Sequence, residues 1–304
     1  MAVSPITEPA LLLLDKAAGR TSRKAAGQAA RQVGARKYGH LGTLDPFATG
    51  LLPVMMGRAT RLAQYLPQEP KAYSAEVLLG QSTTTDDCEG EVLEEADLPS
   101  LEPTDLARAT AAFSGTLTQR PPAFSAIRVD GQRAYKRARR GEAVEVPERE
   151  VEIHRLELRM VAADRLELDV ECGSGTYIRS LARDLGVFFG SRAHLVGLRR
   201  TRVGDWSLDD AAPVEAMPAS GVVGMNQALA LCGEAVALPA PTHLYLRQGK
   251  PLSALPELQP LGPGRYSLFC GPQAVALVEQ GLEGAWRYCI VLPEASQQER
   301  SLGG

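Results

Sequence analysis

The sequence predicts an α+β protein with one large domain followed by a small, mainly β domain. Both strand-like and helical hydrophobic spacing occur in the first 238 residues. Residues 73–79 alternate like a strand, whereas the apolar positions after residue 176 follow a helical period. From residue 239 onward, proline and glycine separate short alternating runs, which is typical of a small barrel. We therefore predict domains at 1–238 and 239–304.

The composition is that of an ordinary globular protein. The 304 residues are 44% hydrophobic and 23% charged, and no apolar run approaches the roughly 20 residues of a membrane-spanning helix. No basic segment precedes the apolar run at 11–14, so we expect no signal peptide and a cytoplasmic location. The five cysteines are scattered and form no C-x-x-C pair, which indicates neither a zinc ribbon nor a disulfide framework.

Opposite charges are concentrated in different parts of the chain. The net charge of −3 argues against a protein that binds nucleic acid through its overall charge. However, acidic residues concentrate at 86–97, whereas lysine and arginine dominate 16–61 and 120–140. Such segregation is compatible with an oriented contact to RNA through one basic face.

The first predicted elements include a cationic helix. An apolar run at 11–16 predicts a strand, which ends in a turn at Gly19. Thr21 and Ser22 are candidate caps for an alanine-rich helix over 23–33 with cations on one side. Two interpretations of these cations stay open, because they could hold phosphates or form a solvated face.

The segment 39–50, G-H-L-G-T-L-D-P-F-A-T-G, carries the most informative carboxylate of the chain. Asp45 is the only acidic residue between Asp15 and Glu69, in an interval rich in lysine and arginine. Pro46 keeps Asp45 out of the helical region, so the carboxylate lies on a stiff, extended loop. A lone carboxylate among cations suggests a catalytic group placed where a polyanion binds. A residue that caps the next element or pairs with one arginine is the equally open alternative.

The elements after this loop alternate between strand and helix. We predict a buried strand at 51–56, a helix at 58–66 and the strand at 73–79. A second helix is predicted at 104–113, with Thr104 as its cap.

The segment 120–147 is predicted to be an RNA-gripping insertion. Phe124 and Tyr135 lie among its cations, and aromatic rings interleaved with positive charge suit loops of RNA. A solvated hairpin and helix is the alternative. The cations predicted to contact RNA are Arg128, Arg133, Lys136, Arg137, Arg139 and Arg140.

Two alternating strands, at 147–158 and 165–172, precede a helix that begins near Thr176. Tyr177 and Arg179 are predicted in its first turn. A cation at a helix N-terminus opposes the helix dipole, so Arg179 should have a specific partner there. From these residues alone, a surface salt bridge would be sufficient. Three further strands, at 265–270, 273–278 and 285–292, are predicted to form the small barrel.

Several motifs, in order along the chain, resemble those of the TruB-type tRNA pseudouridine synthases. The segment at 39–50 resembles the catalytic motif of that family. K-A-Y at 71–73 with the strand after it, G-T-Y-I-R at 175–179 and L-R-R at 198–200 resemble its other motifs. The resemblance covers nearly all of 10–210. It implies a pseudouridine synthase fold, with a mixed, mainly antiparallel sheet flanked by helices, and a C-terminal PUA-like β-barrel.

The resemblance also assigns roles to individual residues. Asp45 would be the catalytic carboxylate, Arg179 its partner, and Tyr73 the ring that stacks on the target base. The substrate-binding residues that the resemblance implies are His40, Tyr73, Tyr177 and Leu198. The chain departs from the family pattern at Thr84, Phe124 and Lys136.

The implied activity is isomerisation of uridine to pseudouridine at position 55 in the T-loop of tRNA. Such chemistry needs no cofactor and no metal ion, and the chain contains no Walker, Rossmann or metal-ligand motif. We expect a monomer with tRNA as its partner, without an obligatory protein partner. Two alternatives are a guide-RNA-dependent synthase and a non-catalytic tRNA-binding protein. The lack of a long basic terminal extension favours the stand-alone enzyme.

Overall fold

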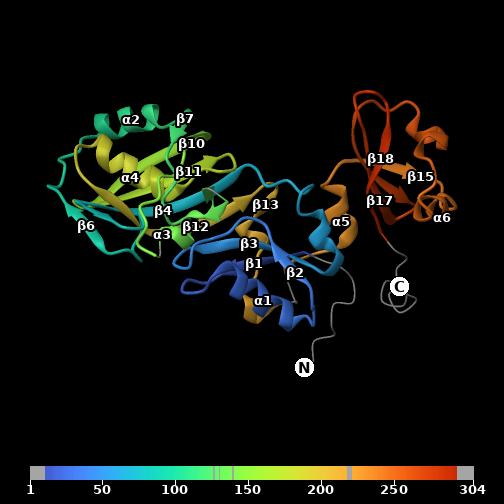
Figure 1. The fold of residues 1–304 in the computed structure, drawn as a ribbon, viewed down its shortest axis with the longest axis horizontal. Coiled ribbons are helices and arrows are strands. Elements are labelled where there is room, and N and C mark those ends of the chain that lie inside the picture. The colour runs from blue at the N-terminus through green and yellow to red at the C-terminus, as the bar shows by residue number, and fades with distance from the viewer. Residues whose placement is uncertain (1–10, 126, 130, 139, 218–220, 293–304) are drawn as a thin grey trace.

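The computed structural model describes residues 11–125, 127–129, 131–138, 140–217 and 221–292 (Figure 1). The α-helices are α1 (Ser22–Gln32), α2 (Pro103–Ala112), α3 (Ala134–Ala138), α4 (Ile178–Phe188), α5 (Met225–Ala230) and α6 (Thr242–Arg247). The 3₁₀ helices are η1 (Gly57–Leu62), η2 (Leu208–Asp210), η3 (Val214–Ala216), η4 (Leu252–Ala254) and η5 (Pro256–Leu258). The strands are β1 (Leu11–Lys16), β2 (Tyr38–His40), β3 (Thr49–Met56), β4 (Lys71–Leu79), β5 (Gln81–Thr83), β6 (Val92–Glu95), β7 (Gly115–Gln119), β8 (Arg128–Val129), β9 (Gln132–Arg133), β10 (Arg149–Ala162), β11 (Arg165–Cys172), β12 (Ala193–Val203), β13 (Trp206–Ser207), β14 (Val222–Val223), β15 (Glu234–Leu238), β16 (Gly264–Cys270), β17 (Gln273–Gln280) and β18 (Trp286–Val291).

One ten-stranded sheet forms the centre of the large domain. Its main order is β14-β1-β3-β12-β4-β11-β10-β7, while β2 pairs with β3 and β13 pairs with β12. All of these pairs are antiparallel except β3 with β12. The α+β class with a mixed, mainly antiparallel sheet is therefore confirmed.

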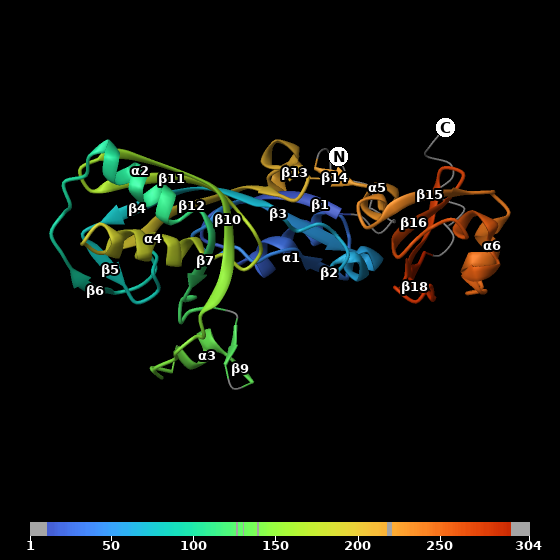
Figure 2. The same ribbon diagram turned by 90° about the horizontal axis from the view of Figure 1, so that it is seen from above.

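Two helices cover one face of this sheet, as Figure 2 shows. The alanine-rich face of α1 packs on β1 and β3, in a cluster that includes Ala26, Leu12 and Val54. The predicted apolar face of α4 packs on β4, β11 and β12 through Leu181 and Leu185. The hairpin β8–β9 and helix α3 project from the same side of the sheet (Figure 2).

Three predicted helix boundaries differ from the structure. Helix α2 is capped by Glu102 instead of Thr104, because Pro103 takes the first helical position and the Asp105 carboxylate accepts from Glu102 N at 3.0 Å. The predicted helix at 58–66 is the shorter 3₁₀ helix η1. Helix α4 begins at Ile178, so Tyr177 is its N-cap residue and lies before the first turn.

The C-terminal sheet has the order β15-β16-β17-β18. Strand β15, which comes just before the predicted domain boundary at 238/239, pairs in parallel with β16 over its whole length. Strands β15 and β18 are at opposite ends of this order among the described residues, and the additional sheet is consistent with the predicted PUA-like domain.

The two domains share a hydrophobic cluster. Leu62 of the large domain and Leu229 of α5 pack with Leu277 and Ile290 of the C-terminal sheet. The Arg265 guanidinium also lies 4.9 Å from the centre of the Tyr65 ring. Such packing positions the small domain against the end of the large one.

None of the helices in the described parts of the chain is both long and apolar enough to cross a membrane.

Gly50 allows β3 and β12 to approach each other closely. Its φ is +99°, and a Cβ atom there would lie 2.3 Å from the Arg200 carbonyl oxygen. We expect Gly50→Ala to lower the free energy of unfolding by roughly 3 kcal/mol, from backbone strain and steric overlap together. The measurement is urea denaturation followed by circular dichroism.

Gly115→Ala is the matched control for this substitution. Gly115 also has a positive φ, +84°, but a Cβ atom there would meet nothing within 4 Å. It should therefore lose only the strain component, about 1 kcal/mol. Equal losses for the two variants would contradict the steric explanation.

Candidate active site

The loop between β2 and β3 holds Asp45 by contacts on both of its neighbours. Ser22 is buried, and its hydroxyl donates to Leu44 O and accepts from Leu44 N, both at 2.8 Å. On the other side, the buried Lys16 ammonium donates to Pro46 O at 3.2 Å. The backbone is therefore fixed immediately before and after Asp45. Its side chain remains 32% exposed, so a ligand can reach the carboxylate.

Arg179 faces Asp45 with two nitrogen atoms. Its Nε lies 3.0 Å from Asp45 Oδ2, and its Nη2 donates to Oδ1 at 3.3 Å. The Arg179 side chain is only 4% exposed and comes from the first turn of α4. A planar guanidinium that meets both carboxylate oxygens restricts the orientation of the carboxylate. The ionic partner expected from the position of Arg179 near a helix N-terminus is thus Asp45.

A second carboxylate, which the sequence analysis did not single out, shares the same guanidinium. Asp87 Oδ2 lies 3.3 Å from Arg179 Nη1, and the Asp87 side chain is 4% exposed. The Thr85 hydroxyl and the Glu89 amide both donate to Asp87 Oδ1. The only sequence signal for this residue was its place in the polar segment after the strand at 73–79.

Backbone carbonyl groups complete the surroundings of the guanidinium. Arg179 Nη1 donates to Thr85 O at 2.9 Å, and Nη2 donates to Phe124 O at 3.0 Å. Arg179 therefore connects the Asp45 loop, the segment after β5 and the base of the projecting hairpin. A buried cation with this many partners has little freedom to move when a ligand binds.

The protonation of Asp45 depends on opposing effects. Burial raises the pKa of its carboxyl group and is the largest influence. The positive charge of Arg179 lowers this pKa, whereas the negative charge of Asp87 raises it. Burial also lowers the pKa of Lys16 to about 8, while the charge of Asp45 acts in the opposite direction. Arg179 is therefore the main group that favours the ionised form of Asp45.

Tyr73 lies on β4 beside a buried arginine. The guanidinium of Arg200 interacts with the Tyr73 hydroxyl, and burial raises the pKa of the tyrosine. Arg200 is 1% exposed, and it donates to Leu51 O at 2.8 Å and to Gly42 O at 3.0 Å. The negative charge of Asp45 also raises the pKa of Tyr73. Sequence reasoning missed Arg200, because the L-R-R motif does not indicate which arginine is buried.

The other predicted substrate-binding residues surround this centre. Leu198 packs against the same two hydrophobic clusters as Tyr73. Tyr177 is the N-cap residue of α4, two residues before Arg179. The Arg149 guanidinium carbon lies 5.0 Å from the centre of the Tyr177 ring. His40 lies at the end of β2, and its Nδ1 is buried without a hydrogen-bond partner among the described residues. Burial lowers the pKa of His40, which favours a neutral imidazole.

The projecting hairpin and α3 carry most of the cations predicted to grip RNA. Arg128 and Arg133 are register partners on β8 and β9, and both are exposed. Lys136 is exposed on α3. Within the described parts of the chain, these three side chains take part in no ion pair. Arg139 lies outside the described residues.

Two other cations of this segment are paired with an acidic residue of the same segment, Glu142. Glu142 accepts from Arg137 Nε at 2.8 Å and from Arg140 Nε at 2.7 Å. The net positive charge of 120–147 is therefore smaller than the run of cations at 120–140 suggests. The free cations of the projection are better described by Arg128, Arg133 and Lys136.

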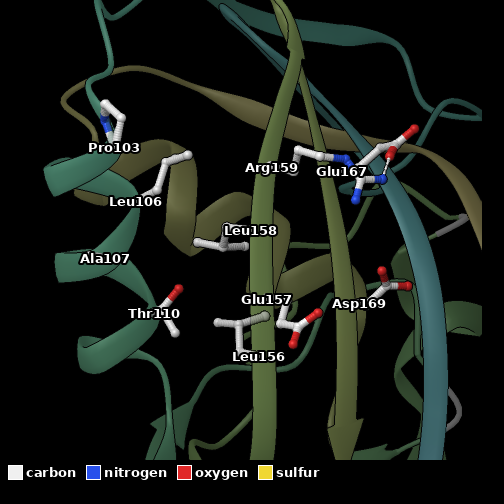
Figure 3. A pocket seen from close by; sticks show the side chains of 10 residues that line it. All are labelled: Pro103, Leu106, Ala107, Thr110, Leu156, Glu157, Leu158, Arg159, Glu167 and Asp169. Carbon is white, nitrogen blue, oxygen red and sulfur yellow. Dashed lines mark hydrogen bonds and ion pairs between the residues drawn. The ribbon is translucent and has the colours of Figure 1, made fainter.

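A hollow of about 500 Å³ lies between α2 and strands β10 and β11 (Figure 3). Its walls include Leu106, Leu156 and Leu158, and an ion pair between Arg159 and Glu167 borders it. None of the residues that line it was predicted to be functional. Among the described residues, no three histidine, cysteine, aspartate or glutamate side chains are grouped so that they could hold a metal ion.

Comparison with known proteins identifies the group to which this site belongs. Residues 30–178 match the N-terminal domain model of the TruB family pseudouridylate synthases. A relative from Xanthomonas campestris pv. campestris strain 8004, named tRNA pseudouridine synthase B, is 46% identical over 228 residues, which are 75% of this chain and 74% of the relative. The chain belongs to the TruB family. A second TruB-family relative of the same name, from Thermobifida fusca, is 46% identical over 221 residues, 70% of this chain and 75% of the relative.

Solved structures support the fold of this TruB-family chain independently of close sequence identity. A chain in the crystal structure of a Cbf5–Nop10–Gar1 complex matches with a TM-score of 0.66 at 23% identity, over 94% of this chain and 84% of that one. A chain in an H/ACA ribonucleoprotein bound to a substrate RNA containing 2′-deoxyuridine matches with a TM-score of 0.65 at 19% identity, over 94% and 84%. The predicted pseudouridine synthase fold is therefore confirmed, and the match extends into the C-terminal sheet.

Proposed function

We propose that this protein isomerises uridine to pseudouridine at position 55 in the T-loop of tRNA. The observation that carries the proposal is the partly exposed Asp45 carboxylate, whose two oxygens both face the buried Arg179 guanidinium. It occurs in a chain whose TruB-family relatives are named tRNA pseudouridine synthase B.

The reaction exchanges one bond to the sugar for another. The bond from C1′ to N1 of uracil breaks, the base turns within the site, and a bond from C1′ to C5 forms. The proton on C5 is lost to solvent and N1 gains a proton, so the reaction involves no net oxidation or hydrolysis. Asp45 can attack the sugar or remove a proton from it, and both routes need the ionised carboxylate.

The surrounding residues suit a nucleoside that has left its stack. Extrusion of a base costs a few kcal/mol, and contacts in the site must replace the lost stacking. In our proposal the Tyr73 ring stacks on the uracil, and Leu198 and Tyr177 border the base. The neutral imidazole of His40 fills the space that the base leaves, since an uncharged ring loses little hydration there.

The projecting hairpin and the C-terminal domain extend the RNA surface in this proposal. The exposed cations Arg128, Arg133 and Lys136 would contact phosphates, as would Arg137 and Arg140 once RNA competes with Glu142. The C-terminal sheet, from residue 234 onward, would act as a PUA-like RNA-binding domain. The protein would function in the cytoplasm as a monomer, without a guide RNA.

The guide-dependent alternative receives less support from the comparisons. The relatives named tRNA pseudouridine synthase B are 46% identical to this chain, whereas the chain in the Cbf5–Nop10–Gar1 complex is 23% identical. The higher identity favours a stand-alone tRNA enzyme. A non-catalytic tRNA-binding protein would have no need for an exposed carboxylate fixed by a buried guanidinium.

The test is release of tritium from unmodified tRNA labelled at C5 of uridine, with purified protein and no other RNA. We expect stoichiometric release at one position, and chemical mapping should locate the product at nucleotide 55. A tRNA with cytidine at that position is the matched control and should release nothing above background. Binding without tritium release would exclude the enzymatic function, and release only after addition of a guide RNA would favour the alternative synthase class.

A further inference from the structure

A basic groove lies along α1 and β2 and adjoins the site described above at His40. It consists of two adjoining hollows, of about 720 and 470 Å³, which share Arg23 and Tyr38 in their walls. We call this surface the α1 groove. No acidic residue lines either hollow. The cations of the α1 groove are Arg20, Arg23, Lys24, Arg31, Arg36 and Lys37.

These six cations differ from most of the other arginines in their partners. Elsewhere in the large domain and in the C-terminal sheet, arginine side chains at the surface form ion pairs. Examples are Arg155–Glu157, Arg192–Glu94 and Arg287–Glu279. By contrast, the cations of the α1 groove are all exposed and form no ion pair with any described residue. Their charges therefore remain available to an external anion.

The arrangement of these charges is unfavourable for the isolated helix. Arg23 and Lys24 lie in the first turn of α1, where positive charge opposes the helix dipole, whereas Arg31 in the last turn has a favourable position. The first turn of α1 contains no acidic residue to balance the helix dipole. A charge pattern that opposes helix formation is explained if a bound polyanion neutralises it.

An aromatic ring lies between the two hollows. Tyr38 is 37% exposed, and a Cβ atom on Gly27 would come within 2.6 Å of its hydroxyl oxygen. The lack of a side chain at Gly27 therefore makes room for this ring on the surface of α1. Exposed rings surrounded by cations are the usual platforms for unstacked bases of RNA.

The α1 groove is continuous with the active site along the chain. Strand β2 carries both Tyr38 and His40 and leads directly into the loop with Asp45. At the other end of the groove, the Gly19 amide donates to Pro46 O at 2.9 Å, so this turn contacts the same loop. Helix α1 has 11 residues and is about 16 Å long, enough for roughly four successive phosphates.

We propose that the α1 groove binds the phosphodiester backbone of the substrate tRNA, with one unstacked base on Tyr38. The proposal rests on the proposed function and adds a second contact surface to the projecting hairpin. The backbone belongs either to the T-arm itself or to a neighbouring arm of the same tRNA.

The test compares two variants that each lose four positive charges. The groove variant is Arg23→Gln, Lys24→Gln, Arg31→Gln and Lys37→Gln. The control variant is Arg108→Gln, Arg155→Gln, Arg159→Gln and Arg192→Gln, which removes ion-paired arginines elsewhere. We measure the Kd for tRNA by filter binding between about 50 and 300 mM KCl, roughly one third to twice the physiological ionic strength of about 150 mM, together with kcat and KM.

We expect the groove variant to bind tRNA more weakly and with a shallower salt dependence. The slope of log K against log salt should fall by about 0.7 for each lost phosphate contact, hence by about 2 to 3 in total. The control variant should keep the wild-type slope. Equal changes in the two variants would show an effect of net charge alone and overturn the proposal.

The stacking part has its own variants and readout. Tyr38→Ala should weaken tRNA binding by about 5- to 150-fold, while Tyr38→Phe, which keeps the ring, should bind like wild type. If the losses appear with an isolated T-arm stem-loop, the T-arm supplies the backbone; losses seen only with full-length tRNA assign it to another arm. Unchanged binding by Tyr38→Ala would refute the stacking. Turnover by the wild-type protein tests the proposed function separately, so the two ideas can fail independently.

Discussion

Replacement of Asp45 by asparagine is expected to stop pseudouridine formation while tRNA binding survives. The amide has nearly the shape of the carboxylate, but it can neither attack the sugar nor accept its proton. We expect kcat to fall on the order of 10⁴-fold, the upper range for loss of a single acid–base or nucleophilic group. The Kd for tRNA should change less than threefold, roughly 0.6 kcal/mol. Loss of the negative charge of Asp45 removes a repulsion with the phosphates, so tRNA binding should not weaken.

The measurement is single-turnover tritium release together with filter binding. Asp97→Asn is the matched control, because Asp97 is exposed and its side chain forms no ion pair among the described residues. It should retain wild-type turnover. Persistent turnover in Asp45→Asn would remove Asp45 from the reaction, and the activity would then need another group.

Replacement of Arg179 by methionine is expected to reduce both stability and activity. Without the guanidinium, two carboxylates face each other in a largely buried site, at Asp45 and Asp87. Removal of one partner from a buried ionic network typically costs 3–5 kcal/mol, and we expect about 3 because Asp45 is partly exposed to water. Urea denaturation at neutral pH measures this loss.

The pH dependence gives Arg179→Met a second readout. Burial raises the pKa of Asp45 above the ordinary value of 3.8, and Arg179 opposes that rise. Removal of Arg179 should therefore raise the pKa further and move the acid limb of kcat/KM to higher pH. A carboxyl group whose pKa is higher in the folded than in the unfolded state contributes stability at low pH. This contribution is lost as the pH rises from the pKa of the unfolded state to that of the folded state. The deficit of the variant should consequently be smaller below pH 3.8 than at neutral pH.

A double substitution separates charge from packing. If like-charge repulsion causes the loss, Asp87→Asn in the Arg179→Met background should restore about 1 kcal/mol or more of stability. In the wild-type background, Asp87→Asn should instead destabilise, because it removes a partner of the buried guanidinium. Additive effects of the two substitutions would contradict the shared network.

Local patterns predicted the helices and strands well, and their errors have local causes. The apolar spacing of 176–185 predicted α4, because its buried face repeats with the helical period. The cap of α2 was wrong, since Pro103 competes with Thr104 for the start of the helix and favours Glu102 as the cap. Strand β15 was not predicted, because so short a strand is recognised only by its pairing, here with β16.

The candidate site shows a similar division. Asp45 stood out because no other carboxylate lies in its basic interval, and Arg179 because a cation opposes the helix dipole there. Asp87 and Arg200 were missed, because their importance depends on burial and on partners far away in the sequence. The sequence also could not distinguish Arg137, which pairs with Glu142, from Arg128, which does not.

The sequence by itself determined the order of the elements, the motif residues and the family resemblance, since all of these depend on residue types at short spacing. Tertiary structure alone decided which charges meet. Arg179 and Asp45 are 134 positions apart, and only the packing of α4 against the sheet brings them to 3.0 Å. It also decided which cations remain unpaired, because electrostatic interaction depends on distance in space and on burial, and local sequence records neither.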